Sequence, residues 1–258
     1  MKAATDSLAR LHGWTASWLD AGRFSLLTYA PSAWRDTGDL TVYIEGDGRS
    51  WISRTELAAD PTPRDGRVLK LAVRDPGNAV YLARPCHYLD PVQLASCHQR
   101  YWSQARYGVD VVEAIDAALE ALKRRAGADR LRLVGYSGGA QLAVLAAARR
   151  NDIAGIITIG GNLDHRRWTA SQGVSTLSGS LNAADVAGVV QHVPQVHFLG
   201  ALDTTVRREV IDSYLARMTV TSQSRVIEVP GYDHGCCWAD TWPGLLAVAT
   251  KLMGVPGK

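Results

Sequence analysis

Short apolar runs alternate with amphipathic stretches along most of the chain. The runs predict strands at 24–29, 40–44, 79–83, 131–134, 153–159, 196–199 and 225–229. Helical spacing of apolar residues predicts helices at 68–73, 111–126, 140–148, 207–217 and 238–252. This alternation predicts an α/β fold, in which a mostly parallel central sheet carries helices on both faces.

The clearest predicted helix lies between Asp110 and Gly127. Asp110 is predicted to cap its start, with Glu113 as the second half of a capping box. A glycine such as Gly127 is typical of the position that ends a helix. The basic run at 123–125 falls in the last turn, where cations favour the helix dipole, so we interpret it as a solvated helix end.

Two segments depart from the alternating pattern. Residues 1–22 are predicted to form an N-terminal helical extension, because leucines and tryptophans recur there at helical spacing. Residues 162–192 show little periodicity and many Ser, Gly and Asn residues, which predicts a loop excursion over the site. That segment is too short for a separate lid domain, so we expect residues 1–258 to form a single domain.

Composition and charge narrow the class of protein. The 258 residues are enough for one large domain with a sizeable core. The net charge of +3 is small and the basic residues are scattered, which argues against a nucleic-acid partner. No stretch approaches the length of a transmembrane span.

The four cysteines leave the redox compartment open. Cys86 and Cys97 would close a short loop if they were bonded, whereas the adjacent Cys236 and Cys237 are expected to be split or left as thiols rather than joined to each other. All four could also be reduced core residues. The N-terminus has no apolar signal core, so the protein is either cytoplasmic or an exported protein whose signal has been removed.

Residues 135–139 have the pattern Gly-x-Ser-x-Gly between an apolar strand and an Ala/Leu-rich helix. This pattern is typical of a nucleophile elbow, in which Ser137 occupies a sharp turn and small neighbours let the strand and helix approach closely. The backbone N–H of Gly138 would lie at the helix N-terminus, where it can stabilise an oxyanion.

A second glycine-rich loop, at 45–50, follows the predicted strand at 40–44. It is where such an architecture places the other half of an oxyanion hole, and we expect the backbone N–H of Asp47 to be the donor, with Gly46 next. The loop does not match a dinucleotide-binding loop, because it lacks the third glycine and the following helix.

Three residues that follow predicted strands form a candidate triad in the order Ser137, Asp203, His234. Because the carboxyl ends of parallel strands meet at one edge of a sheet, we expect these side chains to converge. His234 would take the proton from Ser137, and Asp203 would orient the imidazole. Asp164 also follows a strand and is the rival acid, whereas Asp233 is expected only to make hydrogen bonds in its loop.

These residues resemble those of the α/β-hydrolase superfamily. Three motifs carry the resemblance: Gly135-Tyr136-Ser137-Gly138-Gly139, Gly200-Ala201-Leu202-Asp203-Thr204-Thr205-Val206 and Gly231-Tyr232-Asp233-His234. It covers roughly residues 24–252 and implies an α/β-hydrolase fold without a large lid domain.

Other segments look like a narrower group of uncharacterised bacterial hydrolases, often exported or lipid-anchored. They are Tyr43-Ile44-Glu45-Gly46-Asp47-Gly48, Arg84-Pro85-Cys86 and His234-Gly235-Cys236-Cys237-Trp238. The chain departs from the superfamily where His-Gly is usual and Glu45-Gly46 stands instead. A carboxylate would disfavour an oxyanion, so we expect Glu45 to face away or to meet Arg49.

Aromatic residues near the predicted site could line a substrate pocket. Tyr136, Trp168 and Trp238 are the candidates, with Gly46 beside them, and core packing is the alternative for each aromatic. No cofactor is implied. His234 and the nearby cysteines lack the paired spacing of a metal site, so no metal is expected.

The resemblance implies a serine hydrolase that cleaves carboxylic esters of small molecules or acyl groups through an acyl-enzyme. An amide or peptide hydrolase, or an acyltransferase, could use the same triad. A non-catalytic binding protein on a hydrolase fold is the remaining alternative, since function depends on the site rather than on the fold.

Overall fold

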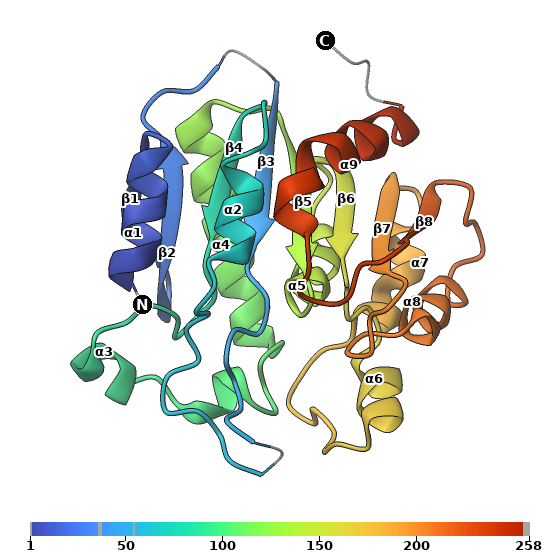
Figure 1. Ribbon diagram of the computed structural model, residues 1–258, viewed down its shortest axis with the longest axis horizontal. Helices are drawn as coiled ribbons and strands as arrows, with labels where there is room; N and C mark the ends of the chain where they lie inside the picture. Colours follow the sequence, from blue (N-terminus) through green and yellow to red (C-terminus); the bar gives the residue numbers. More distant parts are fainter. Residues whose placement is uncertain (1, 36–37, 54, 255–258) are drawn as a thin grey trace.

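The computed structural model describes residues 2–35, 38–53 and 55–254, and its centre is an eight-stranded sheet (Figure 1). The strand order is β1-β2-β4-β3-β5-β6-β7-β8. Six neighbouring strands are parallel: β4 (Ala79–Leu82), β3 (Asp39–Ile44), β5 (Arg130–Tyr136), β6 (Ile153–Ile159), β7 (Gln195–Gly200) and β8 (Ser224–Val229). β1 (Trp14–Ala21) and β2 (Phe24–Pro31) form an antiparallel hairpin, and β2 joins β4 antiparallel. The predicted mostly parallel sheet is confirmed.

Helices cover both faces of this sheet, as predicted. One face packs against α1 (Lys2–Leu11), α2 (Arg67–Ala72) and α9 (Trp238–Leu252). The other packs against α4 (Val109–Ala126), α5 (Gly139–Ala147), α7 (Ala187–Val190) and α8 (Arg208–Leu215). Alternation along β3 serves both cores, because Val42 and Ile44 face α4 and α5 while Tyr43 faces α2 and α9.

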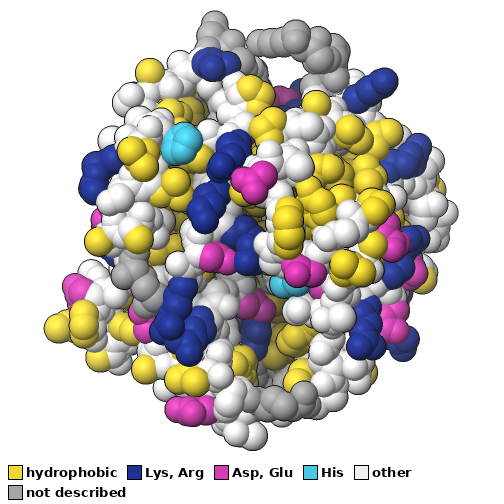
Figure 2. Space-filling view, viewed as in Figure 1, with side chains coloured by type: hydrophobic (Ala, Val, Ile, Leu, Met, Phe, Trp, Pro, Cys, Tyr) yellow, Lys and Arg dark blue, Asp and Glu magenta, His cyan; other side chains and the backbone are white. Residues whose placement is uncertain are grey.

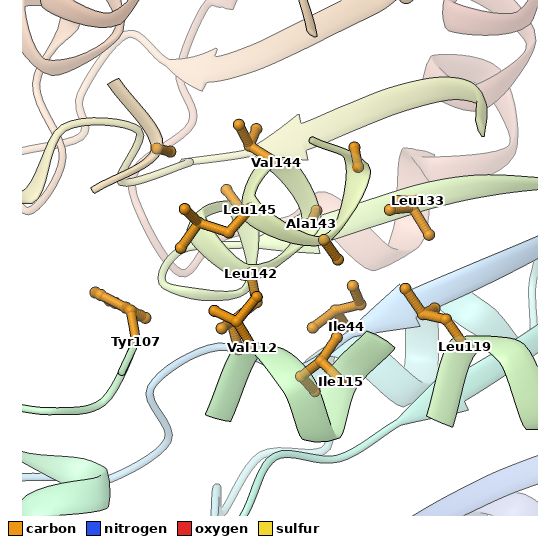
Figure 3. Packing of buried hydrophobic residues seen from close by; sticks show 14 of the residues in the cluster. Ile44, Tyr107, Val112, Ile115, Leu119, Leu133, Leu142, Ala143, Val144 and Leu145 are labelled. Atoms are coloured by element: carbon orange, nitrogen blue, oxygen red, sulfur yellow. The ribbon is translucent and has the colours of Figure 1, made fainter. Parts of the chain in front are cut away.

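The core between α4, α5 and the sheet positions the first turn of α5. Every residue of α5 is buried, which fits a helix that is apolar on all sides. Figure 3 shows Leu142 of α5 lying against Val112 and Ile115 of α4, with Ile44 of β3 beside them. α4 and α5 therefore pack side by side on this face of the sheet, and these contacts hold the first turn of α5 relative to the ends of the strands.

The N-terminal segment differs from the prediction of a helical extension over 1–22. The helix α1 ends at Leu11, and Trp14–Ala21 form β1, paired with β2. Gly13 has a positive φ of 71°, which ends the helix, and Gly22 (φ 71°) forms the hairpin turn. The aromatic and apolar residues of this segment recur at a spacing that fits either a strand or a helix. The hydrogen bonds to β2 favour the strand.

The segment 162–192 is also more ordered than the predicted loop excursion. It contains α6 (His165–Gln172), a 3₁₀ turn η2 (Ala183–Val186) and α7. Asp164 caps α6 by accepting hydrogen bonds from the backbone N–H groups of Arg166 and Arg167. A polar helix of about two turns shows little hydrophobic periodicity, so the capping residue Asp164 is the only feature of the sequence that indicates α6. Two further short elements, α3 (Pro91–Ala95) and η1 (Gln99–Trp102), precede α4.

The start of α4 corrects the predicted capping box. Gly108 is the N-cap residue, and the Asp110 carboxylate instead accepts hydrogen bonds from the Tyr101 hydroxyl (2.6 Å) and from Arg100 (3.2 Å). The predicted end is confirmed, since Gly127 ends α4 in the left-handed conformation with φ 63°. No helix in the described ranges is both long and apolar enough to cross a membrane.

Both pairs of cysteines are disulfide-bonded. Cys86 and Cys97 have Cα atoms 5.9 Å apart and close the loop that precedes α4. Cys236 and Cys237 are bonded to each other, which overturns the expectation that the adjacent pair is split or reduced. Cys237 lies in the turn before α9 and has a positive φ of 75°. No cysteine in the described part of the chain is left as a free thiol.

We expect Gly135→Ala to lower the free energy of unfolding by on the order of 1–3 kcal/mol. A Cβ at Gly135 would lie 2.5 Å from the Cα of Ala140, where only backbone could move away. Urea denaturation of the variant measures the loss. The control is Gly244→Ala in α9, where a Cβ meets nothing within 4 Å, and it should raise stability by up to about 1 kcal/mol. Equal stability of the two variants would show that β5 and α5 can separate freely.

Candidate active site

Ser137 lies in the turn between β5 and α5 with a positive φ of 51°, the strained conformation expected of a nucleophile elbow. The glycines around it allow close approach of backbone. A Cβ at Gly139 would lie 2.3 Å from the Ile44 carbonyl oxygen, and one at Gly138 would lie 2.0 Å from a carboxylate oxygen of Asp47. The turn therefore packs directly against the loop that follows β3.

The structure brings Ser137, His234 and Asp203 together as a chain of hydrogen bonds. The Ser137 Oγ lies 3.0 Å from Nε2 of His234, and Nδ1 of His234 lies 2.8 Å from Oδ2 of Asp203. The other oxygen of Asp203 accepts hydrogen bonds from the backbone N–H groups of Thr205 and Val206, each at 2.8 Å. The carboxylate is completely buried, so these bonds fix its direction toward the imidazole.

The loop that carries His234 is held from below by aromatic side chains. The Tyr136 hydroxyl donates to the carbonyl of His234 at 2.8 Å, and the Trp238 indole N–H lies 3.3 Å from the same oxygen. The Asp233 carboxylate accepts hydrogen bonds from the N–H groups of Gly235 and Cys236. Asp233 thus makes loop hydrogen bonds, as its position in the sequence predicts.

The rival acid Asp164 has a different set of partners. Besides capping α6, it accepts hydrogen bonds from the Ser213 hydroxyl at 2.6 Å and from the Asn182 side chain at 2.9 Å. Its hydrogen-bond partners lie in α6, in α8 and at the start of η2, and none of them is His234. Of the two candidate acids, Asp203 is the one placed against the imidazole.

Two backbone N–H groups are free at the predicted oxyanion position. Gly138 precedes the first turn of α5, and Asp47 follows β3. Neither N–H donates to an acceptor within residues 2–35, 38–53 and 55–254, whereas the N–H of Gly46 donates to its neighbour Glu45 at 2.9 Å. Of the three predicted oxyanion donors, Gly138 and Asp47 therefore have backbone N–H groups without an acceptor among the described residues, whereas Gly46 does not.

The side chain of Asp47 lies in a buried network that sequence reasoning missed. Its carboxylate pairs with Arg84 and, at 2.8 Å, with Arg106, and it accepts a hydrogen bond from the Tyr107 hydroxyl at 2.9 Å. Both guanidinium groups are almost completely buried. Burial raises the pKa of the Asp47 carboxyl, but Arg106 and Arg84 outweigh it and hold that pKa well below its usual value.

Glu45 is expected either to face away from the oxyanion position or to meet Arg49, and among the described residues it forms no ion pair with Arg49 and instead meets Tyr81. Its carboxyl is buried, where it accepts hydrogen bonds from the Tyr81 hydroxyl (2.9 Å) and from the N–H of Gly46. Burial raises the pKa of Glu45 to about 7, although these two hydrogen bonds act in the opposite direction. Near neutral pH, the residue that replaces the usual histidine is therefore only partly charged.

An open cleft of about 490 Å³ leads to Ser137 and His234. Three of the predicted substrate-binding residues line it, namely Gly46, Tyr136 and Trp168, and Trp51 lies at its edge. Trp238 does not: it is buried at the start of α9, packs edge-on against Tyr232 and is a core residue, which corrects the prediction. Trp238 is the first residue of α9, which packs on the sheet, and its indole lies against the backbone of the His234 loop.

Among the described residues, no three His, Cys, Asp or Glu side chains are grouped to hold a metal ion. Near the triad, Cys236 and Cys237 are bonded to each other, so they provide no thiolate beside His234.

Solved structures of several hydrolases match the chain over most of its length. An esterase from Pyrococcus furiosus is 13% identical with a TM-score of 0.66, and the match covers 92% of this chain and 90% of that one. An alpha-beta serine hydrolase homologue from Coxiella burnetii is 14% identical with a TM-score of 0.59, covering 92% and 96%. The chain has the α/β-hydrolase fold.

A puromycin-hydrolyzing peptidase from Mycobacterium tuberculosis shares this α/β-hydrolase architecture, with 15% identity and a TM-score of 0.65. The match covers 94% of this chain but only 40% of the peptidase. No family model and no curated protein matches the sequence. The reaction must therefore be argued from the site.

We expect Asp47→Asn to lower the free energy of unfolding by about 3 kcal/mol or more, because two buried guanidinium groups lose their anion. Chemical denaturation measures the change. The control is Asp185→Asn, which removes an exposed carboxylate paired with Arg166 at 2.8 Å and should cost no more than about 1 kcal/mol. A loss for Asp47→Asn no larger than the control would contradict a role for the network in the fold.

The raised pKa of Glu45 predicts a pH-dependent stability. The folded protein holds this proton up to about pH 7, whereas the unfolded chain releases it near 4.5, so stability falls as pH rises through that window. Glu45→Gln removes this contribution. Between about pH 4 and pH 8, the free energy of unfolding of the wild type should fall by about 3 kcal/mol relative to the variant. Parallel profiles of the two proteins in urea would refute the prediction.

Proposed function

We propose that the protein is a serine hydrolase that cleaves carboxylic esters through an acyl-enzyme. Its main support is the chain of hydrogen bonds from Ser137 through His234 to Asp203 at the floor of an open cleft. A serine hydroxyl is a weak nucleophile at neutral pH and needs an adjacent base, and the base needs an orienting carboxylate. The three side chains stand in that relation.

In the first step, Ser137 Oγ attacks the ester carbonyl while Nε2 of His234 takes its proton. Asp203 holds the proton on Nδ1 and stabilises the imidazolium. The tetrahedral oxyanion is held by the N–H groups of Gly138 and Asp47, and the positive end of the α5 dipole lies beside it. His234 then protonates the leaving alcohol. In the second stage His234 takes a proton from water, the water oxygen attacks the acyl carbonyl, and Ser137 leaves with the proton returned by His234.

Ester hydrolysis is favoured over amide or peptide hydrolysis by how much of each structural neighbour the chain matches. It is matched nearly end to end with the esterase, whereas it corresponds to less than half of the puromycin-hydrolyzing peptidase. The intact triad geometry also weighs against a binding protein without activity, because such proteins usually lose the nucleophile or the base. An acyltransferase would need the same first step and a different acceptor.

We further propose that the protein works in an oxidising compartment, such as the periplasm or outside the cell. The support is that all four cysteines are disulfide-bonded. Disulfides are typical of such compartments and rare in the cytosol of mesophiles.

The test is labelling with a fluorophosphonate, followed by peptide mapping. We expect modification of Ser137 in the wild type and no labelling of Ser137→Ala, because only an activated hydroxyl reacts. On p-nitrophenyl esters, Asp203→Asn should lower kcat by on the order of 10⁴-fold.

Asp164→Asn is the matched control for the acid. It removes a carboxylate of the same size that follows the neighbouring strand, and it should leave the labelling rate of the folded protein within about threefold of wild type, because Asp164 makes no contact with His234. A folded wild type that is not labelled would sink the hydrolase proposal, and a larger loss in Asp164→Asn than in Asp203→Asn would reassign the acid.

A further inference from the structure

The cleft above Ser137 is unusually rich in charged side chains. Seven of them line it: the cations Arg49, Arg64, Arg67 and Arg106 and the acids Glu45, Asp47 and Asp65. In Figure 2, a hollow in the lower half of the face lies below a histidine, with Lys and Arg side chains along its side. What this cleft can bind depends on which of these charges are already neutralised.

The carboxylates are occupied by partners within the protein. Asp65 pairs with Arg67 at 2.6 Å, and Asp47 is shared between Arg106 and Arg84 behind it. Glu45 accepts hydrogen bonds from Tyr81 and from its neighbour's N–H, and burial keeps it partly neutral. Since one carboxylate serves two buried guanidinium groups, the floor of the cleft retains excess positive charge.

Two arginines of the lining have no such partner. Arg49, half-buried beside the oxyanion loop, and Arg64, exposed at the rim, form no ion pair with any carboxylate in the described part of the chain. Both residues line the cleft that leads to Ser137 and His234. The unpaired cations therefore lie where a substrate would enter.

An apolar groove of about 700 Å³ continues from this cleft. The two share Trp51, Trp168 and Arg106, so the groove opens into the cleft that Arg49 and Arg64 line. The groove is lined by Ile52, Leu57, Val174 and Leu177. Trp51 and Ile52 are about half exposed and both line the groove, so they offer it an accessible apolar surface.

We propose that the cleft selects amphiphilic esters, which carry an anionic group bound by Arg49 and Arg64 and an apolar part that lies in the groove. This inference rests on the proposed esterase function and names its substrate class. A guanidinium group presents paired N–H donors that match a carboxylate or phosphate, and the contact strengthens where water is partly excluded. Ser137 cleaves the ester while these arginines hold the substrate.

Two matched pairs of esters test the selection. One pair is p-nitrophenyl hemiadipate against p-nitrophenyl hexanoate, which places the anion on the acyl side. The other is 4-carboxyphenyl butyrate against 4-carbamoylphenyl butyrate, which places it on the alcohol side. In at least one pair we expect the wild type to favour the anionic ester at least about tenfold in kcat/KM, through KM, and roughly 0.5 M salt should reduce this preference.

Variants show whether the two arginines cause the preference. Arg49→Gln and Arg64→Gln should each lower the ratio of kcat/KM values for the preferred pair by about tenfold, and the double variant by more, because each removes one charge-assisted contact. The control is Arg217→Gln, an exposed arginine outside the cleft without an ion pair among the described residues, which should leave the ratio unchanged. No preference in the wild type, or a preference that survives in the double variant, would overturn the proposal.

Binding separates this inference from the proposed reaction. In folded Ser137→Ala, monoethyl adipate should quench the fluorescence of the cleft tryptophans with a Kd at least about tenfold lower than that of ethyl hexanoate. The same substitution combined with Arg49→Gln and Arg64→Gln should abolish the difference. If the wild type hydrolyses no ester, the binding measurement still tests the anion site. Tighter binding of monoethyl adipate would then support the anion site and reject the esterase function. Equal binding of the two esters would reject the anion site.

Discussion

The close contact between the start of α5 and the loop after β3 is the constraint on which the site depends. Gly135, Gly138 and Gly139 have no room for a side chain, because backbone or the Asp47 carboxylate already occupies the space where a Cβ would stand. This contact sets the height of Ser137 above the sheet edge. It also brings Gly138 and Asp47, whose backbone N–H groups are the proposed oxyanion donors, close to each other.

The polar groups beneath the site then keep that contact in place. The cation pair on Asp47 holds the loop after β3, the N–H groups of Thr205 and Val206 orient Asp203, and Tyr136 supports the carbonyl of His234. Asp203 and His234 are thus each held by hydrogen bonds from groups outside the Ser137-His234-Asp203 chain of hydrogen bonds. The arrangement is typical of preorganised sites, in which the supporting bonds are made before the substrate arrives.

Much of the fold could be predicted from the sequence, because buried strands and the helices that cover them carry strong periodic signals. Ser137, Asp203 and His234 could be found because each directly follows such a strand. The segment of β1 was misassigned because its apolar residues fit two periods, and only pairing with β2 selects one. The Asp47 network had no signal of this kind, since its ion-pair partners are 37 and 59 residues away in the chain. The bond between Cys236 and Cys237 was equally hidden, because connectivity does not follow from cysteine spacing.

The double use of Asp47 has an evolutionary consequence. Its backbone N–H is a proposed donor to the oxyanion, and its carboxylate pairs with two arginines that form no ion pair with any other acid in the described part of the chain. A lineage that replaced this aspartate alone would keep the backbone N–H but leave two buried guanidinium groups without a counter-ion. A lineage that replaced a single arginine would change the net charge of the buried network near Ser137. Drift at these three positions is therefore expected to be concerted, with Arg84 and Arg106 retained or lost together with the acid, while the exposed tip of the same loop is free to diverge.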